Sequence, residues 1–298
     1  HNLELISTIL SNDSITTMKV KTQTGDIQIL KVVTMTNPTL AEYKPPTIEN
    51  NYFVKYLDYF LEENSYLCYL MEYCDGGSAK SLLKSLSRSL NEREINAIAF
   101  LTLQSLSNLH SRSFIHADLK PENILLNHLG ELKLSDTSFM NSIFQQKRKL
   151  LEPFSPSFCS PQYDSKSRSQ VADIGTPNAK YDIWCLGMTL LHLFDTNFDV
   201  LRENRIPSNI NDKCSRLFKY FLHRCLTVDE IKRNSAEDLL KDPYILQLTP
   251  EQATDIVKSL ANEHIMYLED HEFEICEEEQ LSDIEADIVN STSTPDQA

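Results

Sequence analysis

The stretch that most constrains the fold of this chain is residues 114–127, which read FIHADLKPENILLN. Two short apolar runs flank a polar turn that holds an acid, a base and an amide: Asp118, Lys120 and Asn123. A second short segment, ELKLSD, ends at another acid, Asp136. Two carboxylates and an amide with a lysine between them suit phosphoryl transfer, because one acid can accept a hydroxyl proton while the amide and the other acid hold a metal ion. An acidic strand–turn–strand with a purely structural role is the alternative.

These residues resemble the catalytic loop of eukaryotic protein kinases, H-R-D-L-x-x-x-N, with Ala117 in the place of the arginine. The resemblance covers about residues 3–246. It implies a two-lobed α+β kinase fold, with a small antiparallel β lobe that carries one short helix (1–74) and a larger, mainly α-helical lobe (75–246). Residues 247–298 are expected to form an acidic C-terminal helix and a disordered tail. The string MEYCDGGS at 71–78 resembles the sterile-twenty-like group of serine/threonine kinases.

Hydrophobic periodicity places the elements of this fold. Alternating patterns predict strands over 3–10, 15–23, 26–34, 52–63 and 65–73. Apolar spacing of three and four predicts helices over 79–86, 91–112 and the residues after Pro250. His110, near the end of the second helix, is expected to be a helix-terminus or packing residue rather than a ligand.

The family resemblance also assigns roles to individual residues. Asp118 and Lys120 would be catalytic, Asn123 and Asp136 would hold magnesium, and Lys31 would grip the α- and β-phosphates of ATP. Asp182 would hydrogen-bond the backbone of the catalytic loop, and Arg233 would be structural. Adenine would lie between Ile29 and Leu125, and the full set expected to line the ATP pocket besides Lys31 is Leu10, Met18, Ile29, Met71, Glu72, Cys74 and Leu125.

The first two strands lack the glycine-rich loop of the family. Ser11, Asp13 and Thr16 stand where three glycines are expected, and the first glycine in the chain is Gly25. Glycine matters there because backbone N–H groups must approach the phosphates closely. A carboxylate at Asp13 would repel a triphosphate by roughly 1 kcal/mol at about 4 Å, and more where water is excluded. Ile29, in place of a small residue, should narrow the roof of the pocket.

The regulatory helix of the family corresponds to residues 35–49, which are few and contain Pro45-Pro46. Proline stops a helix, so this element should be short. The family requires a glutamate here to pair with Lys31. Glu42 lies at the better distance in the sequence, Glu49 is a second candidate, and the absence of any such pair is a third interpretation.

The activation segment departs from the family pattern as well. It begins Asp136-Thr137-Ser138, which keeps the acid and loses the phenylalanine and glycine of D-F-G. Ala117 removes the arginine that receives an activating phosphate. Gln162 replaces the glutamate that pairs with a large-lobe arginine, here Arg233, so that arginine would be hydrogen-bonded but not neutralised, at a cost in stability.

Composition narrows the function classes. The chain has 28 basic and 43 acidic residues, a net charge of −15 and a pI of about 5.0, and twelve acids follow the last basic residue, Lys258. Without a basic stripe, we expect no nucleic-acid binding. The longest apolar run, 183–194, is too short to span a bilayer, so we expect no membrane partner. Seven cysteines without ligand-like spacing indicate a reduced, cytoplasmic protein, with the nucleus as an alternative.

Two functions follow from the pattern. The first is a divergent serine/threonine kinase that transfers the γ-phosphoryl group of Mg-ATP to a protein hydroxyl, with weak or partner-dependent activity. The second is a pseudokinase that acts as a scaffold or allosteric regulator of a partner protein, such as an active kinase. The catalytic side chains favour the first, and the altered glycine loop and activation segment favour the second. The chain begins at His1, so we expect it to be a piece of a longer protein. The sequence fixes neither a substrate nor an oligomeric state.

Overall fold

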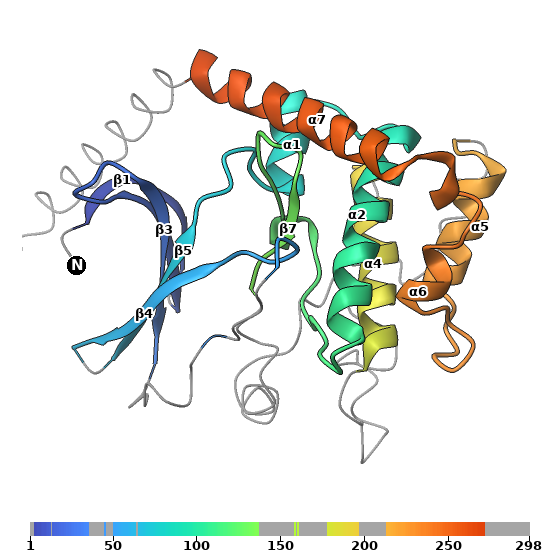
Figure 1. The fold of residues 1–298 in the computed structure, drawn as a ribbon, viewed down its shortest axis with the longest axis horizontal. Coiled ribbons are helices and arrows are strands. Elements are labelled where there is room, and N and C mark those ends of the chain that lie inside the picture. The colour runs from blue at the N-terminus through green and yellow to red at the C-terminus, as the bar shows by residue number, and fades with distance from the viewer. Residues whose placement is uncertain are drawn as a thin grey trace, which may run out of the picture.

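The computed structural model describes residues 3–12, 14–35, 45, 50–63, 65–136, 158, 160, 178–196 and 213–271. A five-stranded antiparallel sheet forms one part of the molecule and a set of helices forms the other (Figure 1). A two-stranded hairpin lies between the two parts. This is the two-lobed α+β architecture expected from the resemblance. The short helix expected within 35–49 and the acidic stretch after His271 fall outside the described residues.

The small lobe is a single sheet with strand order β1-β2-β3-β5-β4. Each neighbouring pair is antiparallel. Strand β5 lies inside the sheet and is buried along almost its whole length, whereas the edge strand β1 is largely exposed. Gly25 adopts a φ of +92° in the turn between β2 and β3, a conformation that glycine accepts without steric cost. The strands are β1 (Glu4–Ser11), β2 (Ile15–Lys21), β3 (Ile27–Thr34), β4 (Tyr56–Glu62) and β5 (Tyr66–Glu72).

The prediction of one continuous strand over 52–63 is wrong at its start. Strand β4 begins at Tyr56, and the residues before it pair with the interlobe hairpin instead. The N–H of Leu134 donates to the carbonyl of Tyr52 at 2.9 Å, and the N–H of Val54 donates to the carbonyl of Leu134 at 3.0 Å. An apolar run has the same pattern whichever strand it pairs with. The sequence therefore could not show whether residues 52–55 continue β4 or pair with the hairpin.

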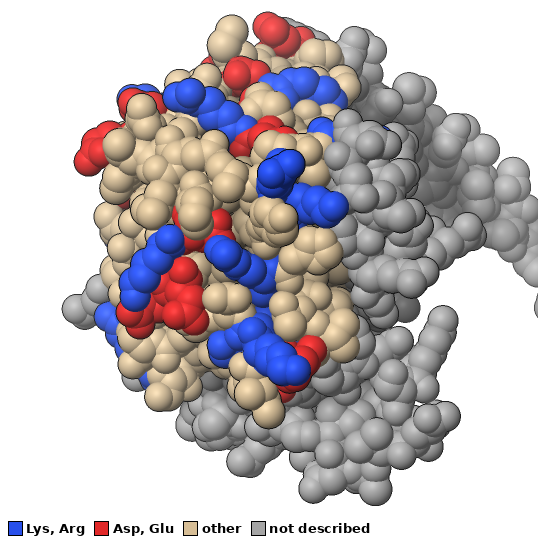
Figure 2. Space-filling view, turned by 90° about the vertical axis from the view of Figure 1, so that its right-hand side faces the viewer, with Lys and Arg blue, Asp and Glu red and all other residues tan. Residues whose placement is uncertain are grey.

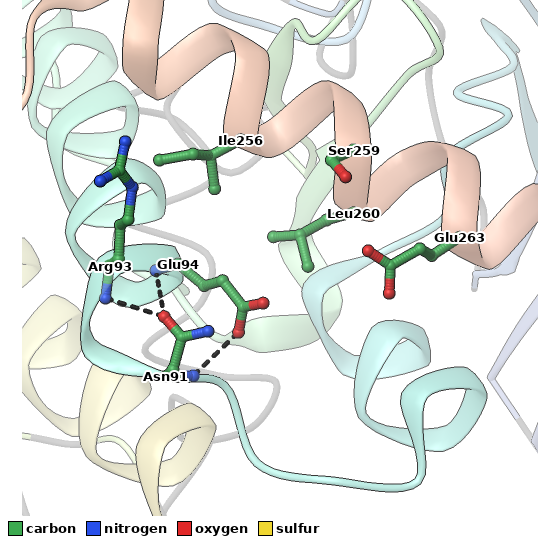
Figure 3. Close-up of a pocket in the computed structure, with 7 residues that line it drawn as sticks. All are labelled: Asn91, Arg93, Glu94, Ile256, Ser259, Leu260 and Glu263. Carbon is green, nitrogen blue, oxygen red and sulfur yellow. Dashed lines mark hydrogen bonds between the residues drawn. The ribbon is translucent and has the colours of Figure 1, made fainter.

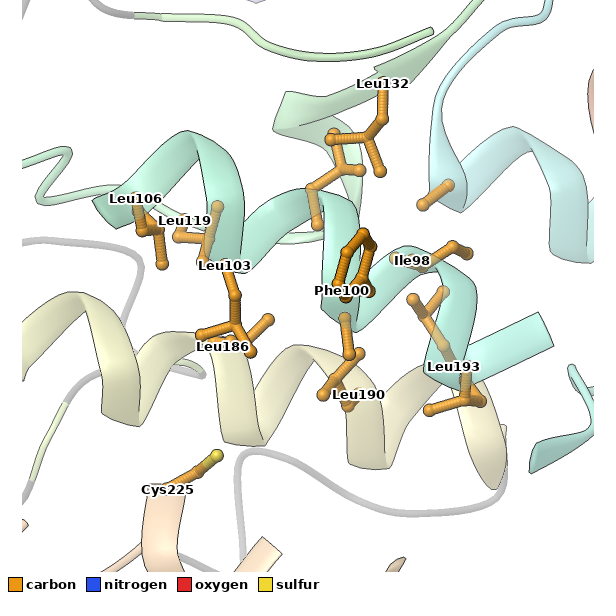
Figure 4. Packing of buried hydrophobic residues seen from close by; sticks show 14 of the residues in the cluster. Ile98, Phe100, Leu103, Leu106, Leu119, Leu132, Leu186, Leu190, Leu193 and Cys225 are labelled. Atoms are coloured by element: carbon orange, nitrogen blue, oxygen red, sulfur yellow. The ribbon is translucent and has the colours of Figure 1, made fainter. Parts of the chain in front are cut away.

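Three helices build the centre of the large lobe: α1 (Ala79–Leu86), α2 (Glu92–His110) and α4 (Ala179–Phe194). Helix α4 is apolar on nearly all sides and is buried from Tyr181 to Leu191, as expected of a helix surrounded by protein. In Figure 4 the side chains of α2 meet Leu186 and Leu190 of α4, and Cys225 approaches α4 from its other side. These contacts place α4 at the centre of the large lobe.

The remaining helices follow α4 in the chain. They are α5 (Arg216–Cys225), α6 (Ala236–Leu239) and α7 (Pro250–Asp270), with single 3₁₀ turns η2 (Pro121–Asn123) and η7 (Ile245–Gln247). Figure 2 shows the side of the large lobe formed by the later helices, where basic and acidic side chains are interspersed among uncharged ones. None of the helices that the structure describes is long and apolar enough to cross a membrane.

Helix α7 lies across α1 and α2 (Figure 1) and reaches the linker that follows β5. Its buried positions recur every three or four residues, so one face of the helix packs against the lobe. A Cβ added at Gly76 would lie 2.6 Å from the Cβ of Ala261, and one added at Gly77 would lie 2.5 Å from Nε2 of His264. The two glycines thus allow the linker and α7 to approach closely.

His264 makes this packing sensitive to pH. Its ring is buried between α7 and α1, with Nδ1 3.0 Å from the hydroxyl of Ser85, and burial lowers the pKa of His264 below its ordinary value. The unfolded chain therefore takes up a proton first as the pH falls below about 6.5, so the free energy of unfolding should decrease from that pH downward.

We expect His264→Gln to weaken this pH dependence, measured as the difference in urea unfolding between pH 7.5 and pH 5.5. The half-buried His192, whose pKa is also lowered by its partial burial, should leave a residual slope. His223→Gln, at an exposed histidine of α5, is the matched control. An equal slope in wild type and His264→Gln would contradict the assignment.

Candidate active site

The catalytic loop follows α2 and is held by a buried carboxylate from α4. The two oxygens of Asp182 accept hydrogen bonds from the backbone N–H groups of His116 and Ala117, both at 2.8 Å. Nε2 of His110 lies 2.8 Å from the same carboxylate. Ala117 has a φ of +66°, which is unusual for a residue with a side chain and is found where surrounding structure imposes it. Asp182 is fully buried and supplies that constraint.

Within the loop, the three polar side chains at the turn contact one another. Nζ of Lys120 lies 3.0 Å from Oδ2 of Asp118. The amide nitrogen of Asn123 donates to the backbone carbonyl of Asp118 at 2.8 Å and to its Oδ2 at 3.3 Å. Asp118 and Asn123 are both nearly buried. The structure therefore brings together the acid, the base and the amide that the motif predicted to act together.

The second acid reaches the loop through the hairpin of β6 (Ile124–Leu126) and β7 (Leu132–Leu134). The N–H of Ser135 donates to the carbonyl of Asn123 at 2.9 Å. His116 ties the two loops together, because its Nε2 donates to the carbonyl of Ser135 at 2.8 Å and its Nδ1 accepts from the N–H of Asp118 at 3.3 Å. Asp136, directly after this contact, adopts a φ of +62°. The hairpin thus holds Ser135, the residue before Asp136, against the backbone of Asn123.

Lys31 forms an ion pair with Asp136, across the boundary between the lobes. Lys31 lies on β3 and is buried. Burial alone would lower its pKa, but the negative charge of Asp136, the hydrogen bond to it and the charge of Asp118 more than offset this, so the pKa of Lys31 lies above its ordinary value. The side chain stays cationic at neutral pH. Glu42 and Glu49, the candidates for its glutamate partner, lie outside the described residues.

The residues expected to hold magnesium fit that ion. Hard divalent cations take oxygen ligands, and Asn123 and Asp136 supply an amide oxygen and a carboxylate. The side-chain nitrogen of Asn123 is turned toward Asp118, so its oxygen faces away from that residue. Asp136 already contacts Lys31, so an ion at this site would share the carboxylate with a fixed cation.

The residues expected around adenine come together on the small-lobe side of the hairpin. Met71 lies opposite Ile29 in the β3–β5 pair. Ile29 and Leu125 pack against the small-lobe core that contains Met71 and Cys74. Burial raises the pKa of Cys74 to about 12, so its thiol stays protonated and is not a nucleophile. Met18 on β2 pairs with Leu30 of β3, whereas Leu10 on β1 is mostly exposed.

Two backbone N–H groups in the described part of the turn between β1 and β2 are bonded within the turn itself. Oδ1 of Asn12 accepts from the N–H of Ser14 at 3.0 Å and from the N–H of Ile15 at 2.9 Å. The hydroxyls of Ser11 and Thr16 lie 3.2 Å apart and close the hairpin below the turn. In a glycine-rich loop such groups would face the nucleotide. Here a side chain of the turn itself occupies two of them. Asp13 lies outside the described residues.

Arg233 is one of the largest buried side chains in the large lobe. Its guanidinium donates to the carbonyls of Lys180 at 2.7 Å and of Thr227 at 2.9 Å, lies 3.3 Å from the hydroxyl of Ser160, and stacks over Trp184. Two backbone carbonyls and one hydroxyl thus accept hydrogen bonds from the guanidinium N–H groups of Arg233. Gln162, its expected neighbour, lies outside the described residues, as do Thr137 and Ser138.

Sequence reasoning missed two residues of this region. His110 supports Asp182 from the last turn of α2. Lys133 on β7 is almost completely buried, and its Nζ lies 2.7 Å from Oε2 of Glu72. One feature of the sequence indicated that Lys133 is unusual, because it is a charged residue between two leucines of a short buried strand. Only the fold shows what it contacts.

A surface hollow of about 200 Å³ lies between the start of α2 and α7. Figure 3 shows that Asn91 caps α2 here, accepting from the N–H groups of Arg93 and Glu94, while Ile256, Ser259, Leu260 and Glu263 of α7 form the opposite wall. None of these residues belongs to the catalytic loop or to the hairpin. Within the part of the chain that the structure describes, no group of three or more histidines, cysteines or acids is arranged to bind a metal.

Comparison with known proteins agrees with this geometry. The protein kinase domain family matches residues 40–245. The chain is 32% identical over 221 residues to serine/threonine-protein kinase dst4 of Dictyostelium discoideum, covering 67% of this chain and 43% of that protein. It is 30% identical over 265 residues to serine/threonine-protein kinase 4 homolog B of the same organism, covering 83% and 23%. It is also 30% identical over 230 residues to serine/threonine-protein kinase shk2 of Schizosaccharomyces pombe, covering 71% and 37%.

The chain thus spans less than half the length of these curated relatives. A further similar protein, serine/threonine-protein kinase STE20 of Kluyveromyces lactis, is 29% identical over 223 residues, which are 69% of this chain and 21% of that protein. Together with the two lobes and the catalytic loop, these similarities show that the chain belongs to the eukaryotic protein kinase superfamily, within its sterile-twenty-like group of serine/threonine kinases.

Proposed function

We propose that this chain is a divergent serine/threonine kinase domain that transfers the γ-phosphoryl group of Mg-ATP to a hydroxyl of a protein substrate, with weak or partner-dependent activity. The observation that carries the proposal is the cluster of Asp118, Lys120, Asn123 and Asp136, with Lys31 beside it. Catalysis by such a cluster rests on positioning and electrostatic stabilisation rather than on covalent chemistry. We place the protein in the cytoplasm, as its cysteine content suggests.

The protein groups have separable tasks in this reaction. Asp118 would accept the proton of the substrate hydroxyl, held in place by its contacts with Asn123 and Lys120. Lys120 would offset the negative charge on the moving phosphoryl group. Asn123 and Asp136 would hold magnesium, which neutralises phosphate charge when bound. Lys31, fixed as a cation next to Asp136, would bind the α- and β-phosphates.

A pseudokinase that regulates a partner protein is the second candidate function. Two contacts favour it. Asn12 occupies backbone N–H groups in the turn where the family binds phosphate. Lys31 engages the carboxylate of Asp136 directly, so nucleotide and metal must compete with an internal ion pair. Both features would weaken nucleotide binding without removing a catalytic side chain.

Thermal unfolding with and without Mg-ATP tests the nucleotide site. Binding at one hundred times the dissociation constant adds about 2.7 kcal/mol to the free energy of unfolding, which should raise the melting temperature by several degrees. The magnesium-dependent part of this increase should largely disappear in Asp136→Asn, because the uncharged amide lacks the negative charge with which the carboxylate holds a divalent cation.

Asp26→Asn is the matched control, because Asp26 lies in the exposed β2–β3 turn and should leave the shift unchanged. The absence of any shift at millimolar Mg-ATP in wild type would argue for the pseudokinase function.

A further inference from the structure

Lys133 is a buried cation for which the proposed reaction has no use. Only 4% of its surface is exposed, and its position on β7 is directly opposite Leu125 on β6. Residues opposite each other in an antiparallel pair share a face of the sheet. The side chain therefore leaves the hairpin on the same face as Leu125, toward the small lobe. Burying a lysine this deeply is unfavourable unless an acid and hydrogen bonds compensate it.

The compensating acid is Glu72, the last residue of β5 and the first of the segment that joins the lobes. Nζ of Lys133 lies 2.7 Å from Oε2 of Glu72 and 3.5 Å from Oε2 of Glu131. Burial lowers the pKa of Lys133, but its hydrogen bond and charge interaction with Glu72 outweigh this, so the pKa is raised and the pair stays ionised at neutral pH.

Glu72 uses its second oxygen and its backbone to bind the start of β4. Oε1 accepts from the N–H of Lys55 at 2.8 Å, and the N–H of Glu72 donates to the carbonyl of Lys55 at 3.0 Å. One carboxylate thus connects β4, the interlobe segment and β7. Because β4 and β5 belong to the small lobe and β7 to the hairpin below it, the ion pair crosses the lobe boundary.

We infer that Lys133 is a positioning residue for the nucleotide site, because its ion pair with Glu72 holds the start of the interlobe backbone in place relative to Leu125, in addition to the hydrogen bonds that join Gly76 and Gly77 to Leu126. The interlobe backbone is the edge, and Leu125 is the floor, of the slot in which adenine is proposed to lie. The inference therefore rests on the proposed function. Lys133 itself faces Glu72 rather than the slot. Its loss should loosen the slot and leave Asp118 and Asp136 in place.

Isothermal titration of the whole chain with ADP, in the absence of metal, tests this role. Lys133→Met should raise the dissociation constant about tenfold, which corresponds to about 1.4 kcal/mol. Lys133→Arg, which keeps a cation within reach of Glu72, should stay within about threefold of wild type. Arg224→Met is the matched control, because it removes the cation paired with the buried Asp242 in the large lobe, away from the slot. It should lower the melting temperature without changing ADP affinity.

The outcomes separate this inference from the proposed function. If wild type does not bind ADP, the proposed nucleotide site is wrong. If wild type binds and folded Lys133→Met binds equally well, Lys133 has only a structural role and the inference is overturned. Should Lys133→Met not fold, Glu72→Gln decides, because the amide keeps the shape and loses the charge. That variant should weaken ADP binding about threefold or more, and unchanged affinity would contradict the positioning role.

Discussion

Replacing Asp118 by asparagine should lower phosphoryl transfer to a protein substrate by at least about a hundredfold, since a positioned general base contributes 10²–10⁴ in rate. Asparagine keeps the size of the side chain and can still contact Asn123, but it cannot accept the hydroxyl proton. Asp118 lies next to Lys120 at 3.0 Å, so the substitution also leaves that lysine without its anionic neighbour. Nucleotide binding should change little, because Lys31 and Asp136 are untouched.

The measurement is the rate of phosphate incorporation into a generic serine/threonine substrate, together with nucleotide affinity. Asp229→Asn, a change of the same chemistry at an exposed acid of the large lobe, is the control and should keep the wild-type rate. A kinase loses both its transfer activity and its cellular effect in Asp118→Asn. If wild type shows no transfer and Asp118→Asn keeps the effect on a partner protein, the regulatory function is the correct one.

Replacing Asp182 by alanine should reduce the free energy of unfolding by about 3–5 kcal/mol. The carboxylate is completely buried and accepts hydrogen bonds from two backbone N–H groups of the catalytic loop, at His116 and Ala117. Leaving each such donor buried and unsatisfied costs about 1–3 kcal/mol. His110 would lose its partner as well. Without the anchor, Ala117 has less to hold it at a φ of +66°, so the loop that carries Asp118 should lose its order.

Equilibrium unfolding in urea measures this loss. Asp182→Asn tests its cause, because an amide offers one acceptor oxygen in place of two and should recover only part of the stability. Glu237→Ala, at an exposed acid of α6, is the control and should change stability little. Under conditions where Asp182→Ala remains folded, its transfer rate should still be low. A variant as stable as wild type would show that the loop is held by other contacts.

Much of the fold could be predicted because its signals are local. The alternating pattern of β2 and the three-and-four spacing of α1 and α2 each lie within one element, and the structure has those elements close to the predicted bounds. The start of β4 was predicted wrongly because strand pairing depends on which distant segment lies alongside, as Leu134 does here.

For the candidate site, the sequence by itself determined which chemical groups are present and their order: Asp118, Lys120 and Asn123 within one turn, and Asp136 one short hairpin later. Their spacing is so short that the chain has little freedom to separate them. Only the tertiary structure decided which groups meet across long stretches of chain.

Lys31 meets Asp136 across 105 residues, and Lys133 meets Glu72 across 61. A linear pattern does not encode such contacts, because they depend on how the two lobes pack. Burial then determines the chemistry of these two ion pairs, because it keeps each lysine in contact with its acid and away from water.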